Sequence, residues 1–513
     1  MSPPPGVLIV TESTTAPGPA PAETGLRSRL AALWQDGIMR PVRAVRAAYV
    51  PLLMVYFAYG ALGIIDVSRD MWVKESLSLS PAELAGVAVW LSLPWTIKMV
   101  FGQLVDGVAI FGSRRRVYVL IGAGFTGTGL IILAGAAGGW FKLLPADDAY
   151  VLGAVAMVLG AVIQDVVADA MSSEVVDRVD ETGQPRPDAE IRTDLAMVQV
   201  LGRLALGIGI LSVAGLSGWL AHHFSREHVF LFGLAIPLIS ITGVMFARGE
   251  TGEGQPLDWR ILGGGLAFGT FVVSTALLRV PFAQELVFVV SMAVVLTMLH
   301  MVTRDVEPKT RQAIIFASII IFAFRATPGV GDGYFWWTLD VLKFDEAFYG
   351  ILRQTSAIIA IGAMWLFSRQ LTEYSVTTVL FWIAVAGTIL SLPNIGLFYG
   401  LANWTEATFG FGARTIAVVD AATTSPFADL AMIPMLTLIA YYAPDGQRAT
   451  WFALMASLMN LALVAGQLQT KYLNHIFTVN RGHYGELGDL LITATVIGFV
   501  VPVAVILLLR KRV

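Results

Sequence analysis

The feature that most constrains the fold is a series of apolar runs of about 20 residues, which recur from Tyr49 to the C-terminus. An α-helix of that length crosses the hydrocarbon core of a bilayer, and a helix satisfies its backbone polar groups internally. Charged residues make up 14% of the 513-residue chain, whereas soluble domains contain about 25%. The sequence therefore predicts an all-α polytopic protein, a multi-pass integral protein of the lipid bilayer.

The apolar runs predict about 14 transmembrane helices. Loops rich in Lys and Arg face the cytoplasm, so we assign loop 112–118 (GSRRRVY), loop 303–312 (TRDVEPKTRQ) and the terminal RKR to that side. Both termini are then expected to be cytoplasmic, as an even number of spans requires, and the membrane is the inner membrane if the source is bacterial. The predicted spans are 48–68, 82–105, 116–139, 149–171, 194–221, 227–247, 260–279, 283–303, 311–335, 346–368, 374–400, 414–442, 448–473 and 488–510.

Residues 1–47 precede the first span. Residues 1–25 are rich in Pro, Ala and Thr and lack the basic start of a secretion signal, so we expect a disordered tail. The basic amphipathic segment that follows is expected at the cytoplasmic membrane surface. The chain has no cysteine and six scattered histidines, which excludes disulfides and thiolate metal sites. We expect no metal and no cofactor.

A weak internal repeat organises the chain. Gly63-Ile-Ile-Asp66 matches Gly329-Val-Gly-Asp332, and LSLSPA (77–82) matches LKFDEA (342–347). VVADAM (166–171) matches PFADLAM (426–432), and the three offsets are 266, 265 and 260 residues. The repeat predicts a six-helix unit, 48–247, duplicated as 311–513, with two extra helices within 248–310. Duplicated six-helix halves around a midplane site are the architecture of major facilitator transporters.

The loop after the second span carries a second signal. GQLVDGVAIFGSRRRVY (102–118) contains Gly-x-x-x-Asp followed by a basic cluster. This stretch resembles the signature between spans two and three of the major facilitator superfamily. The resemblance implies a cytoplasmic gate in which the glycine brings two helices close together and the acid pairs with arginines. By resemblance the gate residues are Gly102, Asp106, Arg114, Arg115 and Arg116. In the alternative interpretation the arginines only set topology.

Two further motifs narrow the resemblance. The long form of this loop, QDVVADAM (164–171) and RATPGVGDGYFWW (325–337) together resemble the folate–biopterin transporter family of the major facilitator superfamily. The resemblance implies uptake of folates, pterins or related metabolites, driven by protons. The chain departs from the family in its 14 predicted spans, where 12 are expected, and in its more aromatic GVGDGYFWW stretch.

Asp165 and Asp169 are the main candidates for proton coupling. Four residues apart on a helix, they share one face. In a low dielectric both carboxylates cannot ionise cheaply, which suits a group that loads and releases a proton. The repeat adds Asp429, which matches Asp169, and Asp332, which matches Asp66. The alternative is a purely structural ion pair, and we also expect Lys98 to snorkel or to pair with Asp106.

The candidate substrate-binding residues are three arginines and an aromatic pair. Because folates carry a glutamate tail, the guanidinium groups of Arg203, Arg325 and Arg353 are suited to a substrate carboxylate. Trp336 and Trp337 are suited to stacking on a flat pterin ring. The alternatives are an interfacial aromatic belt and, for Asp66, Arg69 and Asp70, a solvated cluster of ion pairs. The run GAGFTGTG (122–129) predicts a helix-packing face.

The most specific functional hypothesis is a secondary active transporter that moves a folate- or pterin-like small molecule by alternating access with protons. We expect a monomer that binds no nucleic acid. Two alternatives remain open: a 14-helix proton-driven drug exporter, and a non-transporting assembly factor on the same fold. An enzyme is not expected, since Gly-x-Gly-Asp at 329–332 fits intramembrane aspartyl proteases but their Tyr-Asp and Pro-Ala-Leu elements do not occur in the chain.

Overall fold

The computed structural model describes residues 43–513 except 114, 142–143, 181, 247–258, 279, 305, 374, 442–447 and 513. For some helical residues, including 364–373 and Asp429, only the backbone is described. The predicted tail and most of the amphipathic segment therefore lie outside the described residues. Arg46–Val513 forms one compact unit, and this unit is described below.

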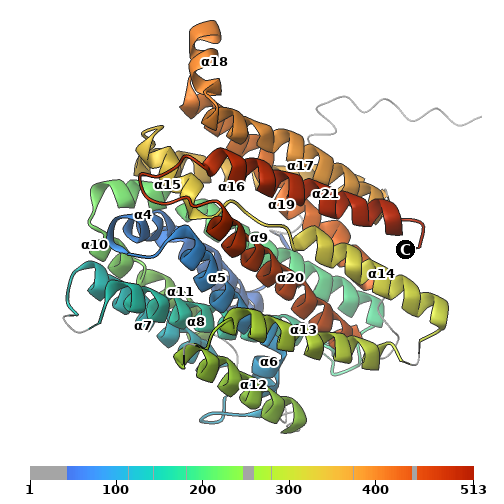
Figure 1. Ribbon diagram of the computed structural model, residues 1–513. Coiled ribbons are helices and arrows are strands. Elements are labelled where there is room, and N and C mark those ends of the chain that lie inside the picture. Colours follow the sequence, from blue (N-terminus) through green and yellow to red (C-terminus); the bar gives the residue numbers. More distant parts are fainter. Residues whose placement is uncertain are drawn as a thin grey trace, which may run out of the picture. The chain divides into compact units, whose positions relative to one another are not determined.

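The described part of this unit is helical (Figure 1). The first helices are α3 (Val50–Ala61), the 3-10 helix η3 (Leu62–Ile65), α4 (Asp66–Ser76), α5 (Pro81–Thr96), α6 (Lys98–Gly107), α7 (Arg116–Ala137), α8 (Ala146–Glu174), α9 (Asp188–His223), α10 (Arg226–Phe232) and α11 (Ala235–Met245). The later helices are α12 (Trp259–Leu277), α13 (Ala283–Val302), α14 (Pro308–Arg325), α15 (Asp332–Asp340), α16 (Glu346–Glu373), α17 (Val376–Phe398), α18 (Leu401–Phe409), α19 (Ala413–Tyr441), α20 (Arg448–Ile476) and α21 (Leu487–Leu509).

Helix length and hydropathy give a count of candidate membrane spans for the described residues. Among the described residues, nine helices are long and apolar enough to cross a membrane, or ten if the bent pair α5–α6 is one span. The predicted count of 14 is therefore not confirmed. The helices α12, α14, α16 and α19 occupy the four remaining predicted positions without meeting that test, and α12 offers only the apolar stretch Leu262–Ala276.

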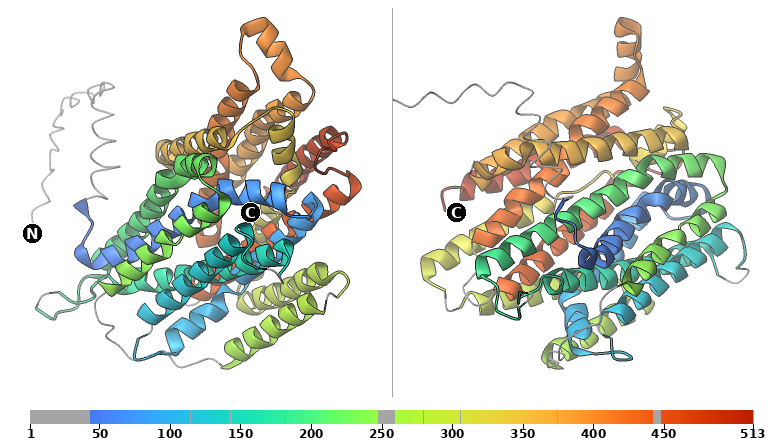
Figure 2. Two further views of the ribbon diagram at one scale, coloured as in Figure 1. Left: turned by 90° about the vertical axis from the view of Figure 1, so that its left-hand side faces the viewer. Right: turned by 180° about the vertical axis from the view of Figure 1, so that it is seen from behind.

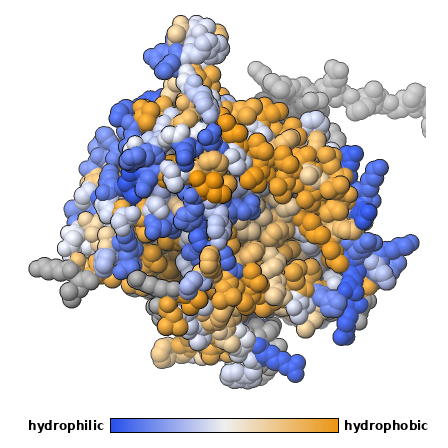
Figure 3. Space-filling model, viewed as in Figure 1, coloured by the Kyte–Doolittle hydropathy of each residue, from blue (hydrophilic) through white to orange (hydrophobic). Residues whose placement is uncertain are grey.

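Hydrophobic side chains cover much of the visible face between hydrophilic groups at its left and right edges (Figure 3). This distribution fits a helix bundle whose middle lies in lipid. We name the two ends of the bundle by their loops. The loop-77 end carries residues 77–80 between α4 and α5, and the loop-108 end carries residues 108–115 between α6 and α7.

Two sets of helices pack against each other. We call α3–α11 the N-terminal half and α14–α21 the C-terminal half. The halves meet mainly where α5 packs on α20 and where α9 packs on α16. The extra helices α12 and α13 lie on the outside of the bundle (Figure 2), with α13 along α20 and α12 beside α6.

Glycines allow the closest helix contacts. A Cβ atom at Gly218 of α9 would lie 2.4 Å from Gly350 Cα of α16, so the two halves touch through backbone there. In the run 122–129, a Cβ at Gly122 would lie 2.9 Å from the carbonyl of Gly160 in α8, which confirms that run as a packing face. The close helix contact expected at Gly102 is not found among the described residues, because a Cβ there would meet none of their atoms within 4 Å.

Interruptions in three helical segments bear on the site. The 3-10 turn η3 separates α3 from α4, a 42° bend separates α5 from α6, and residues 326–331 separate α14 from α15. The aspartates that the repeat aligns, Asp66 and Asp332, are each the first residue of the short helix after an interruption. The two loops that the repeat aligns, 77–82 and 342–347, also share a hydrogen-bond pattern. The side chains of Ser80 and Asp345 each accept a hydrogen bond from a backbone N–H three residues later.

The alternation of helix direction leads to a topology prediction. Phe111 and Lys511 lie at the loop-108 end, and Asn403 in α18 lies at the loop-77 end. In this cysteine-free chain, single cysteines at 111 and 511 are expected to resist an impermeant thiol reagent applied to intact cells, because both should be cytoplasmic. A cysteine at 403 is expected to react. If 111 and 511 differ in labelling, an odd number of spans separates them.

Candidate functional site

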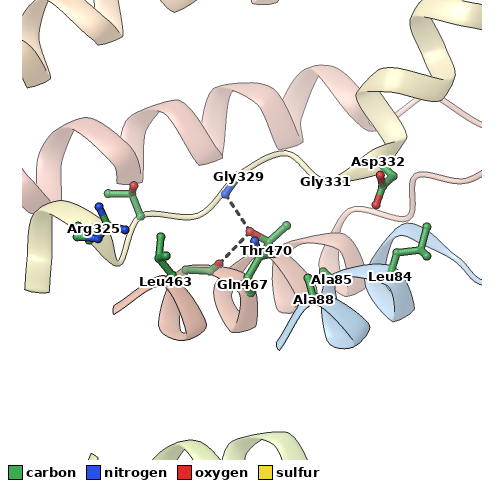
Figure 4. Close-up of a pocket in the computed structure, with 12 residues that line it drawn as sticks. Leu84, Ala85, Ala88, Arg325, Gly329, Gly331, Asp332, Leu463, Gln467 and Thr470 are labelled. Carbon is green, nitrogen blue, oxygen red and sulfur yellow. Dashed lines mark hydrogen bonds between the residues drawn. The ribbon is translucent and has the colours of Figure 1, made fainter. Parts of the chain in front are cut away.

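A cavity of about 310 Å³ lies where the two halves meet. Its walls come from α5, from the interrupted segment between α14 and α15, and from α20 (Figure 4). The lining residues are Leu84, Ala85, Ala88, Arg325, Thr327, Gly329, Gly331, Asp332, Leu463, Gly466, Gln467 and Thr470. A cavity between halves, lined by an interrupted helix, is the usual location of a substrate site in a duplicated transporter.

The interruption is held open by α20. Gly329 N donates a hydrogen bond to Thr470 Oγ1 at 2.9 Å (Figure 4), and Asn474 Nδ2 donates to the carbonyl of Val330 at 3.1 Å. Gln469 Nε2 donates to the carbonyl of Ala326 at 2.5 Å. Side chains of α20 therefore replace the backbone bonds that the interruption removes, as irregular backbone at membrane depth requires.

Arg325 and Asp332 stand at opposite ends of this segment and both line the cavity (Figure 4). The Arg325 side chain contacts the carbonyl of Met459 and the sulfur of Met432. Within the described part of the chain it has no carboxylate partner. An arginine held in a cavity without a counter-charge is available to an anionic ligand.

The carboxylates of Asp165 and Asp169 share one lysine. Lys98 Nζ, at the start of α6, lies 2.5 Å from a carboxylate oxygen of each. Tyr56 of α3 donates a hydrogen bond from its hydroxyl to Asp169 Oδ1 at 3.1 Å. The prediction that the two acids share a face is confirmed, and the expectation that Lys98 pairs with Asp106 is wrong. The bend between α5 and α6 turns Lys98 toward α8.

This Asp–Lys–Asp cluster lies toward the loop-108 end of α8, and neither acid lines the 310 Å³ cavity. The Asp165 side chain is 15% exposed and the Asp169 side chain 52% exposed. Arg203 of α9 is close enough for its charge to act on Asp165, although the described residues give it no direct ion pair. The side chain of Asp429 lies outside the described part of the structure.

Two of the five predicted gate residues, Asp106 and Arg115, form a network at the loop-108 end. The guanidinium of Arg115 lies 2.8 Å from Asp106 and 2.5 Å from Glu174 of α8, and also donates to the carbonyl of Val105. Arg116 begins α7, and Arg114 lies outside the described residues. The network joins α6, α7 and α8, so it locks helices of the N-terminal half together.

The loop-77 end carries the ion pairs between the halves. Arg353 of α16 binds Asp66 at 2.6 Å and Asp70 at 3.3 Å. Lys74 of α4 pairs with Asp340 of α15. Arg226 joins Glu75 and Glu346, and His222 lies 3.7 Å from Glu346. Within the described residues, every ion pair that joins the halves is at this end.

Arg481, in the loop between α20 and α21, makes further side-chain contacts between the halves at the loop-77 end. Its guanidinium donates to the carbonyls of Val73, Lys74 and Leu79 at 2.7–2.9 Å and lies 4.0 Å from the ring centroid of Trp336. Sequence analysis did not single out Arg481, because a lone arginine in a loop resembles a topological signal. The structure therefore adds a clamp across the halves.

Three of the predicted substrate residues are engaged elsewhere in this conformation. Arg353 is bound by Asp66 and Asp70, so the predicted Asp66–Arg69–Asp70 cluster extends across the halves. Trp336 and Trp337 are 0% and 4% exposed. Trp336 packs under Arg481, and Trp337 packs between Tyr334 and Phe398. Neither ring faces the cavity.

A polar group in the C-terminal half was also missed. Tyr334 donates a hydrogen bond from its hydroxyl to Asn394 Oδ1 at 2.8 Å, and the Asn394 side chain lies near the carboxyl of Asp420 in α19. Asp420 Oδ1 is buried without a hydrogen-bond partner among the described residues. An isolated Asp in an apolar helix gives no sequence pattern, so only the packing reveals it.

Known proteins are similar to this chain in sequence or in fold. The model of the BT1 family matches residues 60–513. A protein of Synechocystis sp. (strain ATCC 27184 / PCC 6803 / Kazusa) named "Folate-biopterin transporter" is 26% identical over 86% of this chain and 77% of its own length. "Folate transporter 1" of Plasmodium falciparum (isolate 3D7) is 20% identical over 86% of this chain and 75% of its own.

Among solved structures, a POT family transporter in complex with 5-aminolevulinic acid superposes with a TM-score of 0.65. The superposition covers 91% of this chain and 96% of the chain of that transporter, and the two sequences are 13% identical. A similarity at this level of identity establishes the fold alone. The major facilitator architecture and the resemblance to folate–biopterin transporters are both confirmed. The chain is an integral membrane protein with the major facilitator fold, and it belongs to the BT1 family.

Proposed function

We propose that the protein is a secondary active transporter of folate, a pterin or a related conjugated anion, which it moves by alternating access together with protons. The observation that carries this proposal is the cavity between the halves, which holds an arginine that has no carboxylate partner among the described side chains. The names of the relatives support the substrate class. The transport cycle itself requires no covalent chemistry.

Arg325 supports an anionic substrate. A guanidinium offers a planar fork of donors that matches a carboxylate. In the cavity, Gln467 and Thr470 add neutral hydrogen-bonding groups, and Leu84, Ala85 and Leu463 add apolar wall. A few polar groups on an apolar wall are typical of a small-molecule site. Arg203 is a second candidate cation on the N-terminal side.

The ion pairs support an assignment of conformation. Closure at the loop-77 end, with the loop-108 end joined by no ion pair between the halves among the described residues, fits a state that is open to the loop-108 side. With loop 112–118 in the cytoplasm, this is the inward-facing state.

The proposal divides the chain into halves 48–247 and 311–513 around extra helices within 248–310.

The Asp–Lys–Asp cluster is the proposed proton site. Two carboxylates around one ammonium leave one net negative charge, which a proton can neutralise. The Asp169 side chain is half exposed and lies toward the loop-108 end of α8, which is the side from which we expect water to reach it. Asp332 and Asp429 are secondary candidates at positions that the repeat aligns with Asp66 and Asp169.

The substrate proposal predicts the outcome of a transport assay. Protein in liposomes with an imposed proton gradient is expected to accumulate labelled folate or a pterin, and unlabelled analogues should compete. Arg325→Gln should weaken apparent affinity by about tenfold or more, because a charge-assisted pair with the substrate is lost. Accumulation or expulsion of cationic drugs in place of folate would favour an exporter. If the protein binds neither folate nor cationic drugs and transports neither of them, an assembly factor is favoured.

A further inference from the structure

The bend between α5 and α6 leaves backbone groups that need partners. Helix α5 ends at Thr96, Ile97 has φ −106° and ψ 19°, and α6 begins at Lys98. The last four carbonyls of a helix have no donor within the helix. Pro94 lies in this final turn and lacks an N–H. At membrane depth such groups must find other partners.

The C-terminal half supplies two of those partners. Asn460 Nδ2 donates a hydrogen bond to the carbonyl of Trp95 at 3.0 Å, and Ser457 Oγ donates to the carbonyl of Thr96 at 3.1 Å. Both donors belong to α20. The carbonyl of Leu93 accepts from the hydroxyl of Thr96 within α5 at 2.7 Å. The backbone of the bend is therefore completed across the interface between the halves.

The same bend positions the lysine of the proposed proton site. Only Ile97 separates Thr96 from Lys98, whose ammonium lies 2.5 Å from Asp165 and from Asp169. Donors from the C-terminal half and carboxylates of the N-terminal half thus hold one stretch of four residues. A shift of either set must change the geometry of the other.

The other interruption differs in this respect. Gln469, Thr470 and Asn474 of α20 complete the backbone between α14 and α15, but all of these residues belong to the C-terminal half. Residues of α20 bond the backbone at both interruptions. Only at the bend between α5 and α6 do these hydrogen bonds join one half to the other.

We propose that Ser457 and Asn460 are positioning residues that couple separation of the halves to protonation of Asp165 and Asp169. The inference rests on the proposed function, which it deepens. While both donors are in place, the bend is fixed and Lys98 holds the carboxylates in their ionised form. When the halves separate at this level, the bend loses its donors and Lys98 shifts. A carboxylate oxygen then takes a proton from water.

The coupling is reciprocal by thermodynamic necessity. A proton on either acid weakens the hold on Lys98, which loosens the bend and favours separation. The other groups that face the pair are Tyr56 and Tyr59 of α3 and Arg203 of α9. The ring of Tyr59 stacks on Trp95 of the bend with the centroids 6.1 Å apart, so Tyr59 is expected to follow the same movement. Tyr56 and Arg203 set the baseline charge of the site.

A labelling experiment tests the coupling without any substrate. A single cysteine at Ile97 in the otherwise cysteine-free chain reports exposure of the bend to a small thiol reagent in liposomes. Ser457→Ala combined with Asn460→Leu is expected to raise the labelling rate by about fivefold or more, since two hydrogen bonds are lost. Asp165→Asn combined with Asp169→Asn should raise it as well, because Lys98 loses its anchor.

Two variants control for general loosening. Ser457→Thr keeps the hydroxyl and should retain the parental rate. Ser318→Ala removes a buried hydroxyl that contacts Met455 of α20 but bonds its own helix, so it should leave the rate unchanged. An unchanged rate in either double variant, or an equal rise in Ser318→Ala, overturns the proposal.

Transport assays separate this inference from the proposed function. The Ser457→Ala/Asn460→Leu protein should lose most proton-driven accumulation while equilibrium exchange of substrate persists, because the proton site stays intact but is no longer linked to the halves. If Asp169→Asn accumulates substrate like the parent, the proton function fails, and the labelling still decides whether the linkage exists. If Asp169→Asn abolishes accumulation but labelling never changes, the linkage alone is wrong.

Discussion

Asp169→Asn is expected to abolish proton-driven accumulation and to spare equilibrium exchange. The amide keeps the size of the carboxyl and can still bond Tyr56, but its charge is fixed at zero. One coupled proton allows about tenfold accumulation for each unit of pH difference, and a transporter without a coupled proton allows none. Exchange needs no net proton movement, so labelled substrate should still equilibrate.

The measurement compares accumulation and exchange in the same liposomes across pH 5 to 8. Asp148→Asn is a matched control, because it makes the same change on the same helix at an exposed position in the first turn of α8. Asp165→Asn should behave like Asp169→Asn or shift the pH optimum. If accumulation and exchange fall together with thermal stability, the pair is structural. Parental accumulation in Asp169→Asn would move the proton role to Asp332.

Lys98 makes this result more informative. In the parent its ammonium balances two carboxylates, whereas in either single variant it balances one. Lys98→Met would leave two carboxylates together without their cation, and a proton should then remain bound to the pair. Such a variant should exchange substrate but fail to respond to the gradient, which distinguishes coupling from simple loss of the fold.

Much of the membrane architecture follows from the sequence because hydropathy and helical spacing are local properties. The spacing of Asp165 and Asp169 predicts one face, and the helix preserves it. The Gly-x-x-x-Asp loop predicts the pairing of Asp106 with arginine, which the structure contains. The match over residues 60–513 confirms the family.

The partners of these residues could not be predicted, because they depend on breaks in helices. Lys98 reaches α8 because the backbone turns at Ile97, and no periodicity specifies that turn. Gly102 carries a motif without the close contact the motif implies, since helix approach depends on the partner's position. The aromatic pair after Asp332 looked like a stacking surface, but Trp336 and Trp337 complete the packing at the loop-77 end.

Arg481→Met is expected to open the loop-77 end. The guanidinium bonds three carbonyls of the segment 73–79 and stacks on Trp336, and methionine keeps an unbranched apolar stem but has none of the donors. Loss of these charge-assisted bonds should disfavour the closed state by about 3 kcal/mol, which is roughly a hundredfold in its equilibrium. The carbonyls that are freed gain water only when the end opens, which adds to the shift.

A cysteine at Ala88, which lines the cavity on α5, measures this opening through its reaction with an impermeant thiol reagent applied from the loop-77 side. Arg481→Met should accelerate labelling by about tenfold or more, because a closed state that protects the cavity is depopulated. Arg414→Met is the matched control. Like Arg481, Arg414 bonds a backbone carbonyl and stacks on an aromatic ring at this end, and it also pairs with Asp345. All of these partners of Arg414 belong to the C-terminal half. Equal acceleration in both variants would mean that Arg481 supports the fold locally and does not clamp the halves.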